Sequence, residues 1–208
     1  MANKELWDKI FAERTALADD VAGLKPAQLD KPSLCGGWTV RDVLGHVIGT
    51  GHTSPLNFFG SLLAAGFSFN KFADKKLKQW NSGSPTELAD KLRAITTSTT
   101  SPPGPPLTWL GEVVVHGEDV RRPLGIKHQY PADHLVAVAD FYKGSNLLIG
   151  AKKRISGFTI AADDVHWSTG TGPEVTGPGA ALISAMTGRK AALDDLSGAG
   201  LQQFAARF

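Results

Sequence analysis

Glu112 and His116 are the residues whose type and spacing first suggest chemistry. They lie four positions apart in "GEVVVHGEDVRR" (residues 111–122), on either side of three valines. On a helix this spacing leaves the two side chains roughly 40° apart in azimuth and one turn apart along the axis, so both can reach one metal ion. The same spacing suits two polar side chains on the wet face of a surface helix. The pair alone does not decide between these interpretations.

The neighbours of this pair favour an inward-facing arrangement. Three valines occupy the arc of the helix beside the pair, which indicates a packed face. Asp119 follows His116 at i+3, where it can accept a hydrogen bond from the second ring nitrogen, as carboxylates commonly do behind metal-bound histidines. An ion pair of Asp119 with Arg121 or Arg122 is the alternative.

A third ligand has to come from another helix, and His46 is the best candidate. It lies among valines in "VRDVLGHVIG" (residues 40–49), on the expected inward side. Asp42, one turn earlier, could support His46 as Asp119 could support His116. His52 lies about 120° away around the same helix, which makes joint ligation with His46 awkward. A structural histidine beside an apolar face is the alternative for His46.

Several other chemistries are excluded or disfavoured by the residues present. Cys35 is the only cysteine, so neither an internal disulfide nor a thiolate zinc cluster can form. Nothing basic adjoins Cys35 to lower the pKa of its thiol, which favours an incidental or buried thiol. The sequence contains no His-Glu-x-x-His motif, and its glycine-rich stretch lacks the Gly-Lys-Ser/Thr of a phosphate-binding loop.

Composition points to an ordinary globular protein. The chain has 208 residues, 42% of them hydrophobic and 20% charged, and a net charge of +2 that gives no reason to expect a nucleic-acid partner. Its longest apolar stretch, "LNFFGSLLAAGFSF" (residues 56–69), is too short and too interrupted to span a membrane. The first residues mix both charge signs without the apolar core of a signal peptide. We therefore predict a soluble, cytoplasmic protein without a membrane partner.

Hydrophobic periodicity and capping signals predict the helices that must position these residues. A first helix is expected from about residue 4 to 24, and a second begins at Thr39 with Asp42 in a capping box. A third begins at Ser84 and is expected to run to about Thr97. The next two are expected over 107–124, ended by Gly125, and over about 131–152. These elements predict a helical bundle over residues 1–152.

The remaining residues, 153–208, have a different character. Two short apolar runs, at 158–160 and 165–167, flank an Asp-Asp turn signal and predict a hairpin or small sheet. A short helix in "PGAALISAMTG" and a final one in "GLQQFAARF" are expected to follow. This part is therefore predicted to be a small α/β domain.

Four segments together resemble the mycothiol-dependent maleylpyruvate isomerase family, a branch of the DinB-like superfamily. They are "SLCGGWTVRDVLGHV", "SPTELADKLRA", "GEVVVHGEDVRRPLG" and the looser tail "GPGAALISAMTGRKAALDDLSGAGL". The resemblance runs in the right order over most of the chain. It implies a DinB-like four-helix bundle followed by a small α/β domain.

The resemblance also implies a site. A divalent metal, usually zinc, would be held by His46, Glu112 and His116, the same three residues that the spacing favours. Three protein ligands leave a fourth position open, as in catalytic zinc sites. The thiol of mycothiol is expected to be activated there and to add reversibly to a small electrophile. Arg189 in "TGRK" is a loose candidate for the family's basic residue near the substrate carboxylates, with a surface ion pair as its alternative.

The leading functional hypothesis is a metal-dependent enzyme that uses a low-molecular-weight thiol to isomerise or conjugate a small electrophile. The competing hypothesis is a non-catalytic metal-binding protein of the DinB-like kind, acting in stress response or ligand binding.

Overall fold

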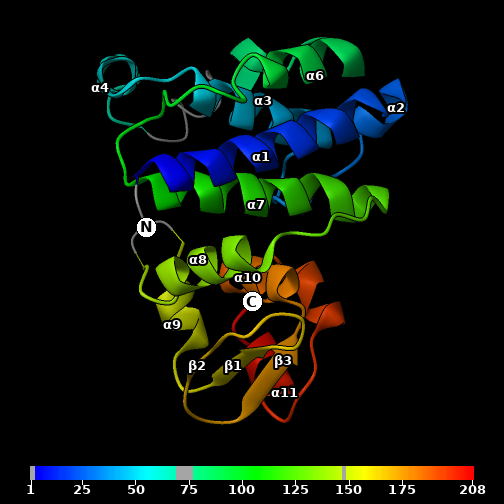
Figure 1. Cartoon of the computed structure of the whole chain (residues 1–208), viewed down its shortest axis with the longest axis vertical. Coiled ribbons are helices and arrows are strands. Elements are labelled where there is room, and N and C mark those ends of the chain that lie inside the picture. The colour runs from blue at the N-terminus through cyan, green and yellow to red at the C-terminus, as the bar shows by residue number, and fades with distance from the viewer. Residues whose placement is uncertain (1–2, 69–76, 147–148) are drawn as a thin grey trace. The chain divides into compact units, whose positions relative to one another are not determined.

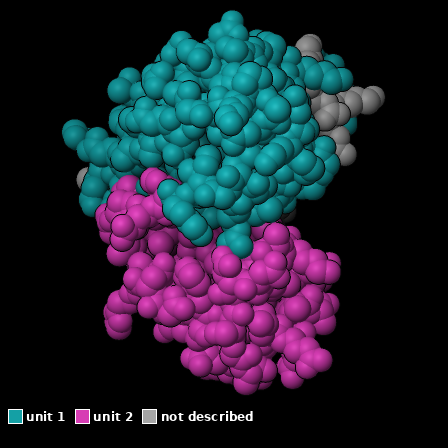
Figure 2. All heavy atoms as spheres, turned by 90° about the vertical axis from the view of Figure 1, so that its right-hand side faces the viewer, with its two compact units in different colours: residues 1–127 teal, residues 128–208 magenta. Residues whose placement is uncertain are grey.

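Figure 1 shows a computed structural model of the chain, which describes residues 3–68, 77–146 and 149–208. Helices dominate these residues, and the strands of the described part form a small sheet of three strands, β1 to β3, after residue 158. The chain divides into two compact units, Met1–Lys127 and His128–Phe208, which Figure 2 distinguishes by colour. The expected combination of helices and a small C-terminal α/β part is confirmed.

The first unit contains long helices that pack on one another in pairs. α1 packs on both α6 and α7, and α3 packs on the same two helices. Their facing sides are fully buried and aliphatic, with Ile10 and Leu17 from α1, Leu44 from α3, and Leu110 and Val114 from α7. The described helices of this unit are α1 (Asn3–Ala22), α2 (Pro26–Leu29), α3 (Val40–Gly51), α4 (Pro55–Ala64), α6 (Pro85–Arg93) and α7 (Pro106–Leu124).

The predicted helix signals that matter most for the site are confirmed. Thr39 and Asp42 form a capping box at the start of α3, and Ser84 and Glu87 form one at the start of α6. Gly125 ends α7 with a left-handed φ of 69°, a conformation that glycine adopts without steric penalty. The start of α3 and the end of α7 therefore follow from local sequence chemistry.

Two predicted helix extents were wrong. α6 ends at Arg93 rather than near Thr97, because the following Thr and Ser residues restrict helical rotamers and compete for backbone hydrogen bonds. The helix expected over 131–152 is two helices, α8 (Ala132–Tyr142) and α9 (Ala151–Ile155). Gly144 follows α8 closely and Gly150, with φ of 69°, precedes α9, so glycine flanks the interruption of the helix although the apolar periodicity continues.

The second unit combines these two helices with the sheet. Strand β1 lies in the middle, antiparallel to β2 and parallel to β3, so the predicted hairpin is present. Helix α10 packs on α8, α9, β1 and β3. The remaining elements are β1 (Thr159–Ala162), β2 (Ser168–Gly170), β3 (Glu174–Gly177), α10 (Gly179–Met186), the 3₁₀ helix η1 (Lys190–Asp195) and α11 (Leu201–Ala205).

The division between the compact units falls after Lys127 rather than at the expected boundary after Lys152. The reason lies in α8, whose buried residues include Leu135 and Val138 and which packs on α10 of the second unit. Apolar periodicity shows that a helix has a buried face but does not show which elements cover that face, so α8 was assigned to the preceding helices. Among the described residues, no helix is both long and apolar enough to cross a membrane.

Candidate metal centre

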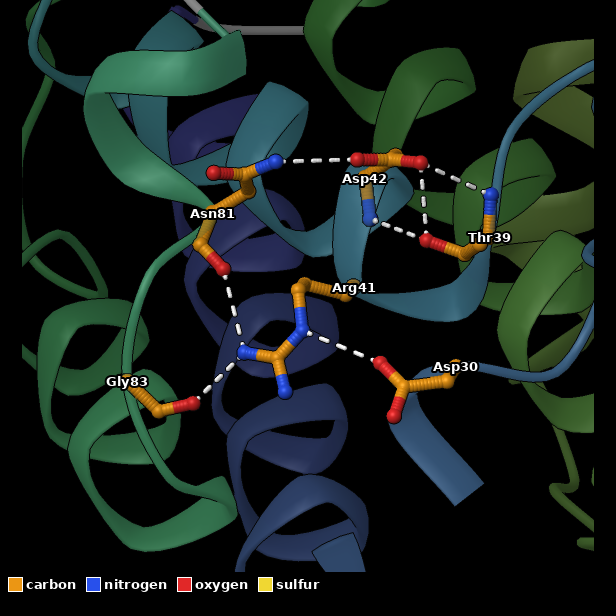
Figure 3. A network of polar contacts seen from close by, with 6 residues as sticks. All are labelled: Asp30, Thr39, Arg41, Asp42, Asn81 and Gly83. Carbon is orange, nitrogen blue, oxygen red and sulfur yellow. Dashed lines mark hydrogen bonds and ion pairs between the residues drawn. The ribbon is translucent and has the colours of Figure 1, made fainter. Parts of the chain in front are cut away.

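Helix α3 is fixed in place at its first turn by two polar side chains (Figure 3). The guanidinium of Arg41 donates from Nη1 to the carbonyl oxygens of Asn81 (3.2 Å) and Gly83 (2.6 Å), and from Nε to the carboxylate of Asp30 (3.4 Å). These bonds connect α3 to the segment before α6 and to the end of α2. The residues one and two turns further along α3 are thereby held in place.

Asp42 serves this same connection. One of its carboxylate oxygens accepts from the backbone nitrogen (3.0 Å) and the hydroxyl (2.7 Å) of Thr39, and the other accepts from Asn81 Nδ2 (2.9 Å). Burial opposes the charge of Asp42, but these hydrogen bonds outweigh it and lower the pKa of the carboxyl. The bonds of this carboxylate thus serve the capping box and Asn81, and the expected support of His46 by Asp42 stays a prediction.

The two candidate histidines lie against each other across the α3–α7 contact. The ring centroids of His46 and His116 are 4.9 Å apart, at an interplanar angle of 71°. Two imidazoles that share one tetrahedral metal ion through bonds of about 2.1 Å have ring centroids roughly 5 Å apart. The observed separation therefore fits two ligands of one ion.

Asp119 supports His116 in the way the spacing suggested. Its Oδ2 lies 2.8 Å from His116 Nδ1, the carboxylate is fully buried, and the histidine side chain is only 14% exposed. With Nδ1 engaged, the Nε2 atom is the ring nitrogen left for a ligand or metal. A carboxylate in this position fixes the tautomer and the ring orientation, and raises the basicity of the second nitrogen.

Glu112 occupies the same region from α7. Burial raises the pKa of its carboxyl, and attraction to His116 and Arg14, together with a hydrogen bond involving Thr50, acts in the opposite direction without outweighing it. Thr50 also donates to the backbone oxygen of His46 (3.0 Å), one turn earlier on α3. Glu112 is therefore a partly buried carboxylate beside His116, linked to α3 through Thr50, and not an exposed residue on a wet face.

The three candidate ligands share one region without forming a closed ligand set. Among the residues that the structure describes, no three His, Cys, Asp or Glu side chains converge closely enough to hold a metal ion as they stand. The chemistry of the donors nevertheless fits: two imidazoles, one of them backed by a carboxylate, and one buried carboxyl group make up a ligand set found in catalytic zinc sites.

Two residues at this site were missed by sequence reasoning. Trp38 packs on His46 and His116, with centroid distances of 5.2 and 6.4 Å. Arg14 is 3% exposed and donates from Nη1 to the backbone oxygens of Ile95 (3.0 Å) and Ser98 (2.9 Å). A signal for Arg14 exists, because it falls on the apolar face of the first helix. For Trp38 the only signal is its place in the "GGWT" stretch.

Arg189 lies in the second unit, whereas the three candidate ligands lie in the first. It follows α10 directly, and its Nη1 donates to the backbone oxygen of Thr187 (3.2 Å). Arg154 lies near enough for the charge of Arg189 to lower its pKa, after the larger effect of burial. Arg154 and Arg189 thus bring two guanidinium groups of the second unit near each other.

In the comparison with known proteins, one family matches part of this chain. Residues 10–103, somewhat less than half of the chain, match the family described as the mycothiol maleylpyruvate isomerase N-terminal domain. This confirms the resemblance predicted from the sequence. The comparison with curated protein sequences found no match.

Two solved structures share the fold over nearly the whole chain. One is a crystal structure of the mycothiol-dependent maleylpyruvate isomerase, with a TM-score of 0.65 and 14% sequence identity, covering 96% of this chain and 93% of that one. The other is a mutant of that enzyme in which one histidine is replaced by alanine, with a TM-score of 0.60, 15% identity and the same coverage. At such identities the likeness shows a common fold.

Proposed function

Because residues 10–103 match the N-terminal domain of the mycothiol maleylpyruvate isomerase family, we propose that this chain is a divalent-metal-dependent enzyme acting with a low-molecular-weight thiol. Its substrate is a small electrophile, which it isomerises or conjugates. The observation that carries the proposal is the 4.9 Å contact of the His46 and His116 rings, with Asp119 directly behind His116. In this proposal α1, α3, α6 and α7 form the bundle that presents the site.

The proposed ligands are His46, Glu112 and His116, with zinc as the expected metal. A divalent metal bound there lowers the pKa of a coordinated thiol, so that the nucleophilic thiolate is available near neutral pH. Asp119 keeps the proton of His116 on Nδ1 and so leaves Nε2 for coordination. Thr50, whose hydroxyl donates to the His46 backbone oxygen, lies beside Glu112 and so adjoins both a ligand from α3 and one from α7.

A thiol nucleophile can either isomerise a double bond by reversible addition or form a lasting conjugate. Sulfur adds to one carbon of a cis double bond, the bond that has become single rotates, and the same C–S bond breaks to release the trans isomer and the unchanged thiol. In conjugation the C–S bond remains, and the carbanion formed by the addition takes up a proton from solvent. Arg189 is the proposed contact for a substrate carboxylate, because a guanidinium recognises carboxylates through paired hydrogen bonds. Mycothiol is the expected thiol.

Metal analysis is the first test. Wild-type protein purified with zinc present should retain about one ion per chain after dialysis. His46→Ala and Glu112→Ala should lose most of it, whereas His52→Ala, which removes a histidine of the same helical region that is no proposed ligand, should not. A wild-type protein that binds no zinc would refute the proposed centre.

A panel of small electrophiles, each assayed with mycothiol and with glutathione, tests catalysis. The proposal expects turnover of at least one electrophile, faster with mycothiol, lost in Glu112→Ala and kept in His52→Ala. Zinc binding without turnover of any substrate would support the alternative of a non-catalytic metal-binding protein.

A further inference from the structure

The segment between α2 and α3, residues 31–39, forms a tightly bonded turn that we name the Trp38 loop. The hydroxyl of Ser33 donates to the backbone oxygen of Trp38 (2.8 Å) and accepts from the backbone nitrogen of Cys35 (3.1 Å). The backbone nitrogen of Trp38 donates to Cys35 oxygen (3.0 Å), and that of Ser33 donates to Trp38 oxygen (2.9 Å). The position of Trp38 is therefore set by the loop's own bonds.

The loop is also attached to the helix that carries His116. The backbone nitrogen of Leu34 donates to the backbone oxygen of Asp119 (3.3 Å), and Asp119 is the residue whose carboxylate holds His116. At its other end the loop passes through the Thr39 cap into α3, which carries His46. Trp38 is thus connected through short stretches of chain to both histidines.

The indole of Trp38 lies on both imidazoles. Its interplanar angle is 50° with His46 and 26° with His116, at centroid distances of 5.2 and 6.4 Å. The three rings form one aromatic cluster contributed by the loop, α3 and α7. Rotation of an imidazole about its terminal torsion is only weakly restricted by its own side chain, so a flat neighbour narrows the range of ring orientations. For His116 the indole acts together with the bond to Asp119.

A second Trp–His pair in the same unit provides a comparison. Trp80 stacks on His52 with centroids 4.2 Å apart and planes 6° apart, a closer contact than either made by Trp38. His52 is not a proposed ligand. Trp38 differs because it contacts two proposed ligands on two different helices.

We propose that Trp38 is a positioning residue of the metal centre, which restricts the orientations of the His46 and His116 rings, the two proposed imidazole ligands. The inference rests on the proposed function, since it assigns Trp38 a role toward the same metal. Apolar groups that pack around metal ligands also limit the access of water. The half-buried indole is an apolar group of this kind beside both histidines.

Three variants separate this role from a general effect on folding. Trp38→Leu keeps an apolar side chain but removes the flat ring, Trp38→Phe keeps a flat ring, and Trp80→Leu makes the same change at the other Trp–His pair. Zinc affinity is measured by competition with a chromogenic chelator, and the visible spectrum of the cobalt-loaded protein reports the ligand geometry.

We expect Trp38→Leu to weaken zinc binding by about tenfold or more, the loss typical of groups that orient metal ligands. Trp38→Phe should restore most of the affinity and the wild-type cobalt spectrum, and Trp80→Leu should match wild type. Equal affinity and an equal cobalt spectrum in wild type and Trp38→Leu would overturn the inference while leaving the metal centre intact. A loss in Trp80→Leu as large as in Trp38→Leu would also overturn it.

NMR of the histidine ring protons in the metal-free protein tests the positioning role of Trp38 without depending on zinc binding. Trp38→Leu should move the ring-proton signals of His46 and His116, and Trp80→Leu those of His52. If wild type bound no zinc, the proposed function would fail, whereas unmoved His46 and His116 signals would refute the positioning role on its own.

Discussion

Asp119 combines two tasks in one residue. Its carboxylate lies 2.8 Å from His116 Nδ1, and its backbone oxygen accepts from Leu34 in the Trp38 loop. Only the first task depends on the side chain, because a backbone oxygen is present in every residue. Substitution at this position can therefore test the support of His116 without removing the attachment of the loop.

Asp119→Asn should weaken zinc binding by about 10- to 100-fold, since an amide stabilises the metal-bound imidazole less than a carboxylate does. The change is measured by chelator competition at fixed pH. Asp20→Asn is a suitable control, because Asp20 also pairs with a buried group of α7, Arg121 Nε at 2.7 Å, away from the histidines. An affinity unchanged in Asp119→Asn would show that His116 does not need its carboxylate.

His52 provides a pH-dependent contribution to stability whose sign follows from its surroundings. Removal from water, and then the positive charge of Arg14, lower its pKa from the ordinary value of 6.5. The folded protein therefore binds this proton less readily than the unfolded chain. The contribution of His52 to stability is complete above pH 6.5 and is lost as the pH falls through the unfolded pKa toward the lower folded value.

We expect an NMR titration of metal-free protein to give His52 a pKa below 6.5. His52→Gln should reduce the loss of unfolding free energy between about pH 7.5 and about pH 5.5, as measured by urea unfolding at both values. A measured pKa at or above the ordinary value would contradict the prediction, and so would an unchanged pH dependence in the variant.

Helix α3 depends on a close approach that only glycine permits. A Cβ atom at Gly45 would lie 2.7 Å from the Cβ of Asn81 and 2.9 Å from its Cα and nitrogen atoms. Asn81 in turn bonds the Asp42 carboxylate and accepts from Arg41 through its backbone oxygen. This contact sets the position of α3, one residue before His46.

Gly45→Ala should therefore lower the unfolding free energy by about 1–3 kcal/mol, because the clash is with backbone atoms that cannot rotate away. Gly60→Ala is the matched control in α4, where an added Cβ meets nothing within 4 Å. Removal of a helical glycine there should be neutral or stabilising by up to about 1 kcal/mol. Urea unfolding of the two variants measures the difference, and an equal effect would contradict the predicted close approach.

The sequence predicts helix ends well where a local side chain makes the cap. Thr39 with Asp42, Ser84 with Glu87, and Gly125 are such cases, since each cap satisfies backbone groups within a few residues. It also places His46, Glu112 and His116 on the correct helices.

What the sequence could not provide depends on contacts between distant segments. The bond between Asp42 and Asn81 could not be predicted, because the two residues lie 39 positions apart in the sequence. The interruption between α8 and α9 was missed because apolar periodicity continues past Gly144. Trp38 could not be placed on the two histidines, because a loop has no periodicity from which its direction follows.

The two compact units differ in what they provide to the proposed enzyme. The first unit contains the three proposed ligands together with Asp119 and Trp38, and the second contains Arg189. Metal binding is thus expected to depend on the first unit, and substrate recognition to involve the second.

A chain ending at Lys127 should fold and bind zinc, whereas one ending at Lys152 should carry an unpartnered α8. Without α10, the apolar face of α8 with Leu135 and Val138 loses the surface that covers it. Limited proteolysis of the longer chain should therefore cut after residue 127, and gel filtration should show more association than for the shorter chain. A longer chain that resists cleavage there would instead support the boundary after residue 152.

The hydrogen bonds that hold the Trp38 loop leave some of its positions open to substitution. Its bonds run through backbone groups and the Ser33 hydroxyl, and Gly37, just before Trp38, has a left-handed φ of 81°. Gly36 is exposed, and an added Cβ there meets nothing within 4 Å. Side chains of many kinds can therefore be introduced at this position while the tryptophan stays in place. Gly36 is accordingly a tolerant position at which mutational libraries can vary the surroundings of the site while α3 and its histidine stay unchanged.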